Sequence, residues 1–221
     1  MRGWTAVAIA LLLCGCPKKG TQKTRTLPPT ALWPSRPPRL PPDCARKGRL
    51  VFVGMDRLVG TSVDEVARHF SETYGLAVEV LPSYPPTVFD AAWEPNQQLN
   101  VDKAIAGLAA HLGTLADVWV MALTHFDLKI DKRTELGFAF SGRHGPITLL
   151  SIARMTDTND LQVDVRLLQS RLFKQMARQI GTTYCGLARK GPPTSVMRET
   201  IQVAADLDSI DEADWRSGPQ P

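Results

Sequence analysis

A predicted helix in the last quarter of the chain carries residues at the spacing of a zinc-binding helix, but not of the types that bind zinc. Arg178 and Thr182 stand four positions apart, and Gln179 directly follows the first of them. Two histidines at this spacing share one helix face and hold zinc, while a glutamate beside the first activates the bound water. An arginine has no lone pair to donate to a metal, and a glutamine cannot accept the proton of a water. These residues predict the frame of a metal site without its chemistry.

The four histidines do not replace the missing ligands. His69 and His111 fall on predicted helices, His125 follows a predicted strand, and His144 lies in a turn-rich segment. No two of them have the four-residue helical spacing of a metal site, so we expect surface or structural histidines. Cys185 as a nucleophile would need a positioned base, and the sequence places none beside it.

Hydrophobic periodicity predicts one α/β domain from residue 50 to residue 221 that positions these side chains. Apolar runs bounded by turn residues predict strands at 49–54, 76–81, 117–123, 137–140 and 147–152, the last two joined by a turn-rich loop at 141–146. Capping residues and apolar spacing of three and four predict helices at about 62–74, 100–112 and 162–184, and residues 82–97 show no period. This order predicts a mixed β-sheet packed against helices.

Residues 1–15 predict a bacterial lipoprotein signal peptide. Arg2 precedes an apolar run of about ten residues, which is too short to span a bilayer. Small residues before Cys16, with Leu13 three positions upstream, match a lipobox. We therefore expect cleavage before Cys16, lipid (palmitate) on that residue, and anchoring in the cell envelope; the alternative is an ordinary secretory signal with incidental cysteines. Pro17 is not the aspartate associated with inner-membrane retention, which favours the outer membrane or its periplasmic face.

Residues 16–49 predict an extended, proline-rich and basic tether. Nine lysines and arginines stand there against the single acid Asp43, so the remainder of the chain is acidic although the whole chain is at +4. A basic tether on an acidic domain argues against nucleic-acid binding. Its cations either meet anionic lipid head groups or only keep the linker solvated. Cys44 and Cys185 either form a disulfide, which an oxidising compartment permits, or remain free thiols.

Several motifs in order resemble the archaemetzincin family of zinc metallopeptidases. The resemblance spans roughly residues 50–211 and includes strand, hairpin, helix and turn motifs. The matching segments are VMALTHFDL at 120–128, GFAF at 137–140, SGR at 141–143, LLSIAR at 149–154, SVM at 195–197 with the Met-turn methionine Met197, and DLDSID at 206–211. The resemblance implies a zincin-like α/β fold that includes the former active-site helix, and it implies zinc as the family's cofactor.

Carried over position by position, the resemblance assigns the zinc-ligand positions to Arg178, Thr182 and Ala188, and the catalytic glutamate to Gln179. If one residue is inserted, Gly186 becomes the turn glycine and Arg189 replaces Ala188 as the third position. Neither alignment supplies a metal ligand, so we expect no metal and no cofactor. The family's second zinc site needs four cysteines, and only Cys185 is near. By this resemblance, His125 and His144 flank the sheet edge that borders the family's substrate groove, so of the four histidines they are the better candidates for a ligand contact, although we expect a structural role for each.

The sequence therefore favours a membrane-anchored lipoprotein whose archaemetzincin-like domain is a non-catalytic pseudopeptidase that binds a peptide or protein. Strand addition at a sheet edge beside the groove would hold such a ligand. Two alternatives stay open. One is an active metallopeptidase with an atypical metal site, and the other is a purely structural envelope protein.

Overall fold

The computed structural model describes residues 40–41, 44, 48–113, 116–131, 139–156 and 164–218. The proposed signal peptide, Cys16 and most of the tether lie outside these ranges. No helix among the described residues is both long and apolar enough to cross a membrane. The elements are β1 Arg49–Gly54, α1 Val63–Tyr74, β2 Val78–Leu81, the 3₁₀ helix η1 Pro86–Ala92, β3 Leu99–Asn100, α2 Val101–Leu112, β4 Val118–Thr124, β5 Leu128–Lys129, β6 Ser141–His144, β7 Ile147–Ser151, α3 Val165–Thr183 and α4 Ala204–Asp208.

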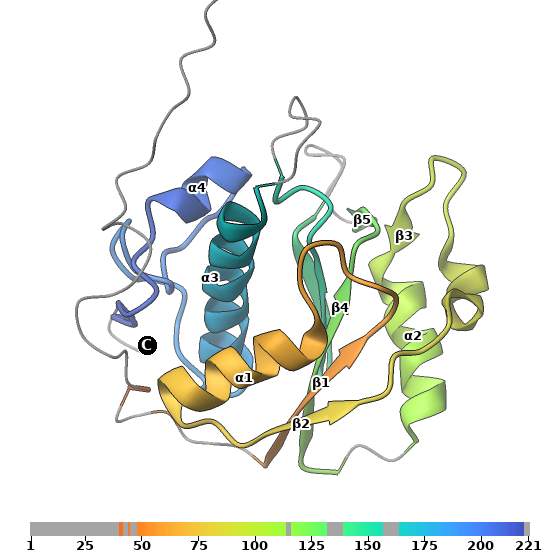
Figure 1. Ribbon diagram of the computed structural model, residues 1–221, viewed down its shortest axis with the longest axis horizontal. Coiled ribbons are helices and arrows are strands. Elements are labelled where there is room, and N and C mark those ends of the chain that lie inside the picture. Colours follow the sequence, from red (N-terminus) through yellow and green to blue (C-terminus); the bar gives the residue numbers. More distant parts are fainter. Residues whose placement is uncertain are drawn as a thin grey trace, which may run out of the picture. The chain divides into compact units, whose positions relative to one another are not determined.

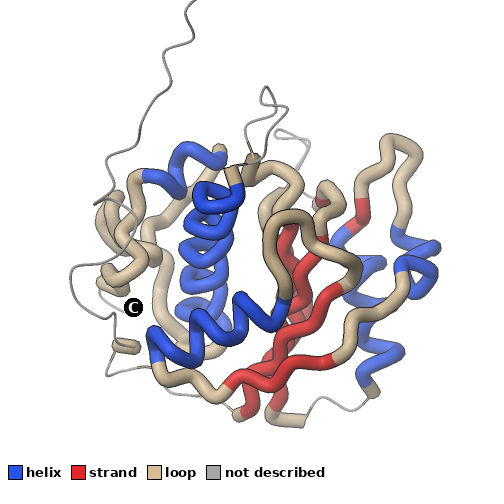
Figure 2. Tube along the Cα trace, viewed as in Figure 1, coloured by secondary structure: helices blue, strands red, loops and turns tan. Residues whose placement is uncertain are grey.

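A five-stranded mixed sheet forms the middle layer of the domain. Its strand order is β2-β1-β4-β7-β6, and only β6 runs antiparallel to its neighbour. Helices α1 and α3 cover one face of this sheet and α2 covers the other, as Figure 1 shows. Figure 2 shows the same three layers by secondary structure, with the sheet between the helices. The predicted α/β class with a mixed sheet is confirmed.

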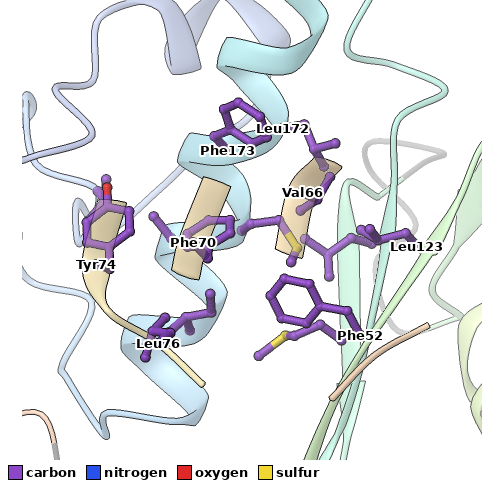
Figure 3. Close-up of a cluster of buried hydrophobic side chains, with 14 of the residues drawn as sticks. Phe52, Val66, Phe70, Tyr74, Leu76, Leu123, Leu172 and Phe173 are labelled. Atoms are coloured by element: carbon purple, nitrogen blue, oxygen red, sulfur yellow. The ribbon is translucent and has the colours of Figure 1, made fainter. Parts of the chain in front are cut away.

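Alternating side chains of the central strands build a core on each face of the sheet. On β1, Phe52 faces α1 and α3, whereas the neighbouring Val53 faces α2. The rings of Phe52 and Phe70 lie 6.0 Å apart edge to face, and Phe70 meets Phe173 of α3 at 6.3 Å. Figure 3 shows these side chains pointing toward one another between the sheet and the two helices. This cluster fixes α3 against the sheet.

Local sequence signals set the ends of α1 and α2 as predicted. Ser62 and Glu65 form a capping box at the start of α1, and Gly75 ends the helix at a φ of 65°. Asn100 caps α2 by accepting a hydrogen bond from the backbone N–H of Lys103 at 3.2 Å.

The first strand of the hairpin lies at residues 141–144 and not at the predicted residues 137–140, so this prediction was wrong. The strand that pairs with β7 is β6, in the segment that the sequence predicts to be a loop, and its turn consists of Gly145 and Pro146. Residues 137–138 of the expected strand lie outside the described ranges, and Ala139 makes only an isolated bridge to Leu128. The sequence of β6 is polar because it is an edge strand that buries few side chains, so it shows no apolar pattern from which a strand could be predicted.

The packed part of the chain begins before the predicted boundary at residue 50. Arg49 starts β1, and Leu40 packs against the core on the α1 and α3 side. A disulfide joins Cys44 to Cys185, just beyond the end of α3. The final stretch of the expected tether is therefore fastened to the domain.

Candidate functional site

Helix α3 carries the residues at the metal-ligand positions, and its opposite face holds it in the core. Asp164 caps its start by accepting hydrogen bonds from the backbone N–H groups of Arg166 and Leu167. Near its end, Gly181 lets Met197 approach closely, because a β-carbon at Gly181 would lie 2.6 Å from the methionine sulfur. Met197 is fully buried there, beneath the helix, as expected of a Met-turn residue.

Arg178, at the first ligand position, is a buried structural cation. Only 3% of the residue is exposed. Its guanidinium donates to the backbone carbonyls of Val196 at 3.3 Å, Glu199 at 2.7 Å, and Arg198. Arg178 thus fastens the turn of residues 195–199 to α3. Burial, followed by repulsion from Arg189 and Arg198, lowers the pKa of Arg178 to about 10, which leaves it charged at neutral pH.

The side chains at the other positions of the frame are joined by Arg189. Its Nη2 donates to Oε1 of Gln179 at 2.9 Å, and its Nε donates to Oγ1 of Thr182 at 3.1 Å. Gly186 adopts a φ of 75°, the left-handed conformation that suits a turn glycine. The alignment with one inserted residue therefore describes the geometry: Arg189 reaches the position of the third ligand, whereas Ala188 does not line the cavity.

These residues open onto a cavity of about 490 Å³ between α3, β6 and the segment of residues 199–202. On its β6 side, Oγ of Ser141 accepts hydrogen bonds from Nε2 of Gln175 at 3.1 Å and of Gln179 at 2.9 Å. The sequence did not single out Ser141 or Gln175 as site residues. The signal for Gln175 is its place one helical turn before Gln179, whereas the contact with Ser141 is a long-range one that no local pattern shows. The lining residues are Ile130, Ala139, Phe140, Ser141, Gly142, Arg143, Gln175, Arg178, Gln179, Thr182, Arg189, Glu199, Thr200, Ile201 and Gln202.

The donor set around this cavity does not fit zinc. Zinc takes cysteine, histidine or carboxylate ligands, whereas two of the three ligand positions hold guanidinium groups, which repel a cation. The remaining position, that of the second ligand, holds Thr182, whose hydroxyl donates to the carbonyl of Arg178 at 2.9 Å. Within the described ranges no group of three or more histidine, cysteine or acidic side chains is arranged to hold a metal ion. We therefore derive no metal chemistry at this site.

The histidines have structural partners away from the cavity. His69 is partly buried, stacks on Phe173, and its Nε2 lies 2.6 Å from Oε1 of Glu212. Nδ1 of His125 lies 2.8 Å from Oδ1 of Asp56, and Nδ1 of His111 lies 2.9 Å from the carbonyl of Gly107. These three fit the expected structural role, and neither His125 nor His144 lines the cavity. Cys185 is bonded to Cys44 and has no thiol to act as a nucleophile.

Neither the family models nor the curated proteins include a match to the chain. Solved structures do match its fold. Archaemetzincin from Methanopyrus kandleri is similar at a TM-score of 0.57 and 20% identity, over 80% of this chain and 92% of that one. Archaemetzincin from Archaeoglobus fulgidus, complexed with malonate, is similar at a TM-score of 0.59 and 19% identity, over 76% and 95% of the two chains. A zinc-dependent peptidase from Methanocorpusculum labreanum is similar at 0.59 and 18%, over 75% and 94%.

The agreement extends over 92–95% of the length of each of these proteins. The chain has an archaemetzincin-like fold.

Proposed function

We propose that this chain is a lipid-anchored envelope protein whose archaemetzincin-like domain is non-catalytic and binds an extended peptide segment beside α3. The observation that carries the proposal is the state of Arg178, a buried cation bonded to three backbone carbonyls at the position of a metal ligand. A side chain that holds the fold together in this way cannot exchange its place for a metal ion. The domain keeps a peptidase frame and an open cavity, but Gln179 stands where that frame places the residue that activates water.

The edge of the sheet beside the cavity supports peptide binding. Strand β6 is the last strand of the sheet, and no strand among the described residues pairs with its outer edge. The carbonyl of Phe140 accepts from the backbone N–H of Ser151, so the backbone groups of Phe140 point toward β7. Because these directions alternate in an antiparallel pair, the N–H and C=O groups of Ser141 and Arg143 point outward. A peptide in extended conformation would use them as its partners.

The peptide part of the proposal is tested with a short extended peptide amide, acetyl-Thr-Val-Thr-Val-Thr-amide, and with a version N-methylated at alternate residues. Strand addition needs alternate peptide N–H groups, so we expect the methylated version to bind at least about tenfold more weakly in calorimetric titration. We also expect no cleavage of the unmodified peptide. Equal binding of both versions removes strand addition, and cleavage that stops on addition of a chelator establishes the alternative of an active metallopeptidase.

The anchor is tested separately by Cys16→Ser. Loss of the lipid-bearing sulfur is expected to move the protein from the membrane fraction to the soluble fraction, and mass spectrometry of the unaltered protein is expected to find acyl chains on Cys16. An unmodified Cys16 in membranes from the native cell contradicts the proposal. Absence of any peptide or protein ligand, together with an envelope defect on deletion, favours a purely structural role.

A further inference from the structure

We infer that the cavity beside α3 recognises a carboxylate on the bound peptide, either its free C-terminal group or an acidic side chain. This inference rests on the proposed peptide-binding function and names the chemistry of its ligand. In a zinc peptidase of this fold the ligand positions would hold the zinc ion, whereas here two of them, Arg178 and Arg189, carry guanidinium groups.

The charge of the cavity lining favours an anion. Arg143, Arg178 and Arg189 line it, and among the described lining residues Glu199 is the only acid. Arg198, on the same turn, is already paired with Asp206 at 3.6 Å. Repulsion from Arg189 and Arg198 acts on Arg178, so the positive charges lie close enough to raise the potential of this wall of the cavity. A bound carboxylate would be attracted to this positive potential.

Arg143 is the residue best placed to grip this group. Side chains alternate along a strand, and Ser141 points toward the amides of α3, so Arg143 projects from the same face of β6 two residues later. It is exposed and lines the cavity, and within the described residues it makes no ion pair or side-chain hydrogen bond. A planar guanidinium binds a carboxylate through two parallel hydrogen bonds, which favours a carboxylate over a neutral peptide group.

A second observation indicates that the cavity takes a polar ligand. Gln175 is 3% exposed, and one end of its amide bonds Ser141, yet its Oε1 has no hydrogen-bond partner in the part of the chain that the structure describes. An unpaired buried amide oxygen is unfavourable, and a ligand N–H group that reaches it would remove this cost. The residue that carries a carboxylate in a peptide also carries a backbone N–H group, so one residue can satisfy both Arg143 and Gln175. A cavity of about 490 Å³ accommodates such a residue.

The experiment compares four peptides that share the Thr-Val-Thr-Val-Thr sequence, in calorimetric titrations of the full protein. They are the neutral amide, the free acid, the amide with a central glutamate and the amide with a central glutamine. We expect the free acid or the glutamate peptide to bind at least about tenfold more tightly than its neutral partner. Whichever of the two pairs shows the difference identifies the source of the carboxylate.

Arg143→Gln is expected to reduce this preference to less than about threefold, because the charged, bidentate partner is lost. Arg68→Gln removes one cation from an exposed position on α1, outside the cavity lining, and is expected to leave the preference unchanged. Equal binding of acidic and neutral peptides, or a preference that survives Arg143→Gln, overturns the inference while peptide binding itself stands. If N-acetylglutamate binds as tightly as the glutamate peptide, the carboxylate site stands and the peptide function falls. If none of the peptides and no acidic probe binds, both the carboxylate site and the peptide-binding function are refuted.

Discussion

Replacing Arg178 with alanine tests whether this residue has become a structural cation of the fold. Keeping its charge in the folded protein is unfavourable, because lowering the pKa of an arginine to about 10 corresponds to roughly 3 kcal/mol. Its guanidinium makes three hydrogen bonds to carbonyls, and hydrogen bonds from a charged donor contribute about 1.5–3 kcal/mol each. The bonds therefore outweigh the cost of burial.

We expect Arg178→Ala to lower the free energy of unfolding by about 2–4 kcal/mol. The carbonyl of Val196 is buried and loses its charged partner, whereas the carbonyls of Arg198 and Glu199 lie nearer the surface and regain water in part. Arg178→Lys keeps the charge but not the planar fork, so we expect a loss of at least about 1 kcal/mol. Urea unfolding followed by tryptophan fluorescence measures both values.

Arg68→Ala is the matched control, since Arg68 is an exposed arginine on α1. Surface substitutions of this kind change stability by less than about 0.5 kcal/mol. A loss for Arg178→Ala no larger than that of the control refutes the structural role of Arg178. An increase in stability on Arg178→Ala refutes it as well, because it would mean that the cost of burial exceeds the contribution of the hydrogen bonds.

Two further predictions concern the segments that close the fold. Cys185→Ser removes the disulfide to Cys44, and we expect it to lower the free energy of unfolding by at least about 2 kcal/mol. A thiol reductant should lower the thermal unfolding temperature of the unaltered protein but not that of the variant. Identical unfolding of both proteins contradicts this prediction. Asp206 accepts hydrogen bonds from the backbone N–H groups of Gln202 and Val203, which hold its pKa below the ordinary 3.8. The folded pKa of this acid lies below the unfolded one, so its stabilisation is present above about pH 4 and is lost as the pH falls through the folded pKa. Asp206→Asn should therefore destabilise the protein at pH 7 and make little difference near pH 2, and an equal loss at both pH values contradicts the assignment.

Local signals in the sequence were enough to predict the elements that are buried or capped. The apolar run of β1 and the capping box at Ser62 each predict a strand or a helix start from only a few neighbouring residues. The apolar stripe that includes Met176 and Ile180 predicts which face of α3 packs in the core. Strand β6 was missed because it lies at the edge of the sheet, where pairing with β7 outweighs a polar sequence.

The candidate site was predictable only in part, because its geometry depends on long-range contacts. The positions of Arg178, Gln179 and Thr182 follow from helical spacing. Spacing alone could not decide between Ala188 and Arg189, because that choice depends on the left-handed turn at Gly186. The three carbonyls that hold Arg178 come from residues 196–199, and no pattern in the sequence pairs them with an arginine on α3.

Metal content tests the central claim most directly. The purified protein is incubated with excess zinc, dialysed, and analysed by inductively coupled plasma mass spectrometry, and its thermal unfolding is measured with and without a chelator. Because the ligand positions hold Arg178, Thr182 and Arg189, we expect far less than one zinc per chain and no effect of the chelator on unfolding. One tightly held zinc per chain, removed by the chelator with a fall in stability, would contradict the account.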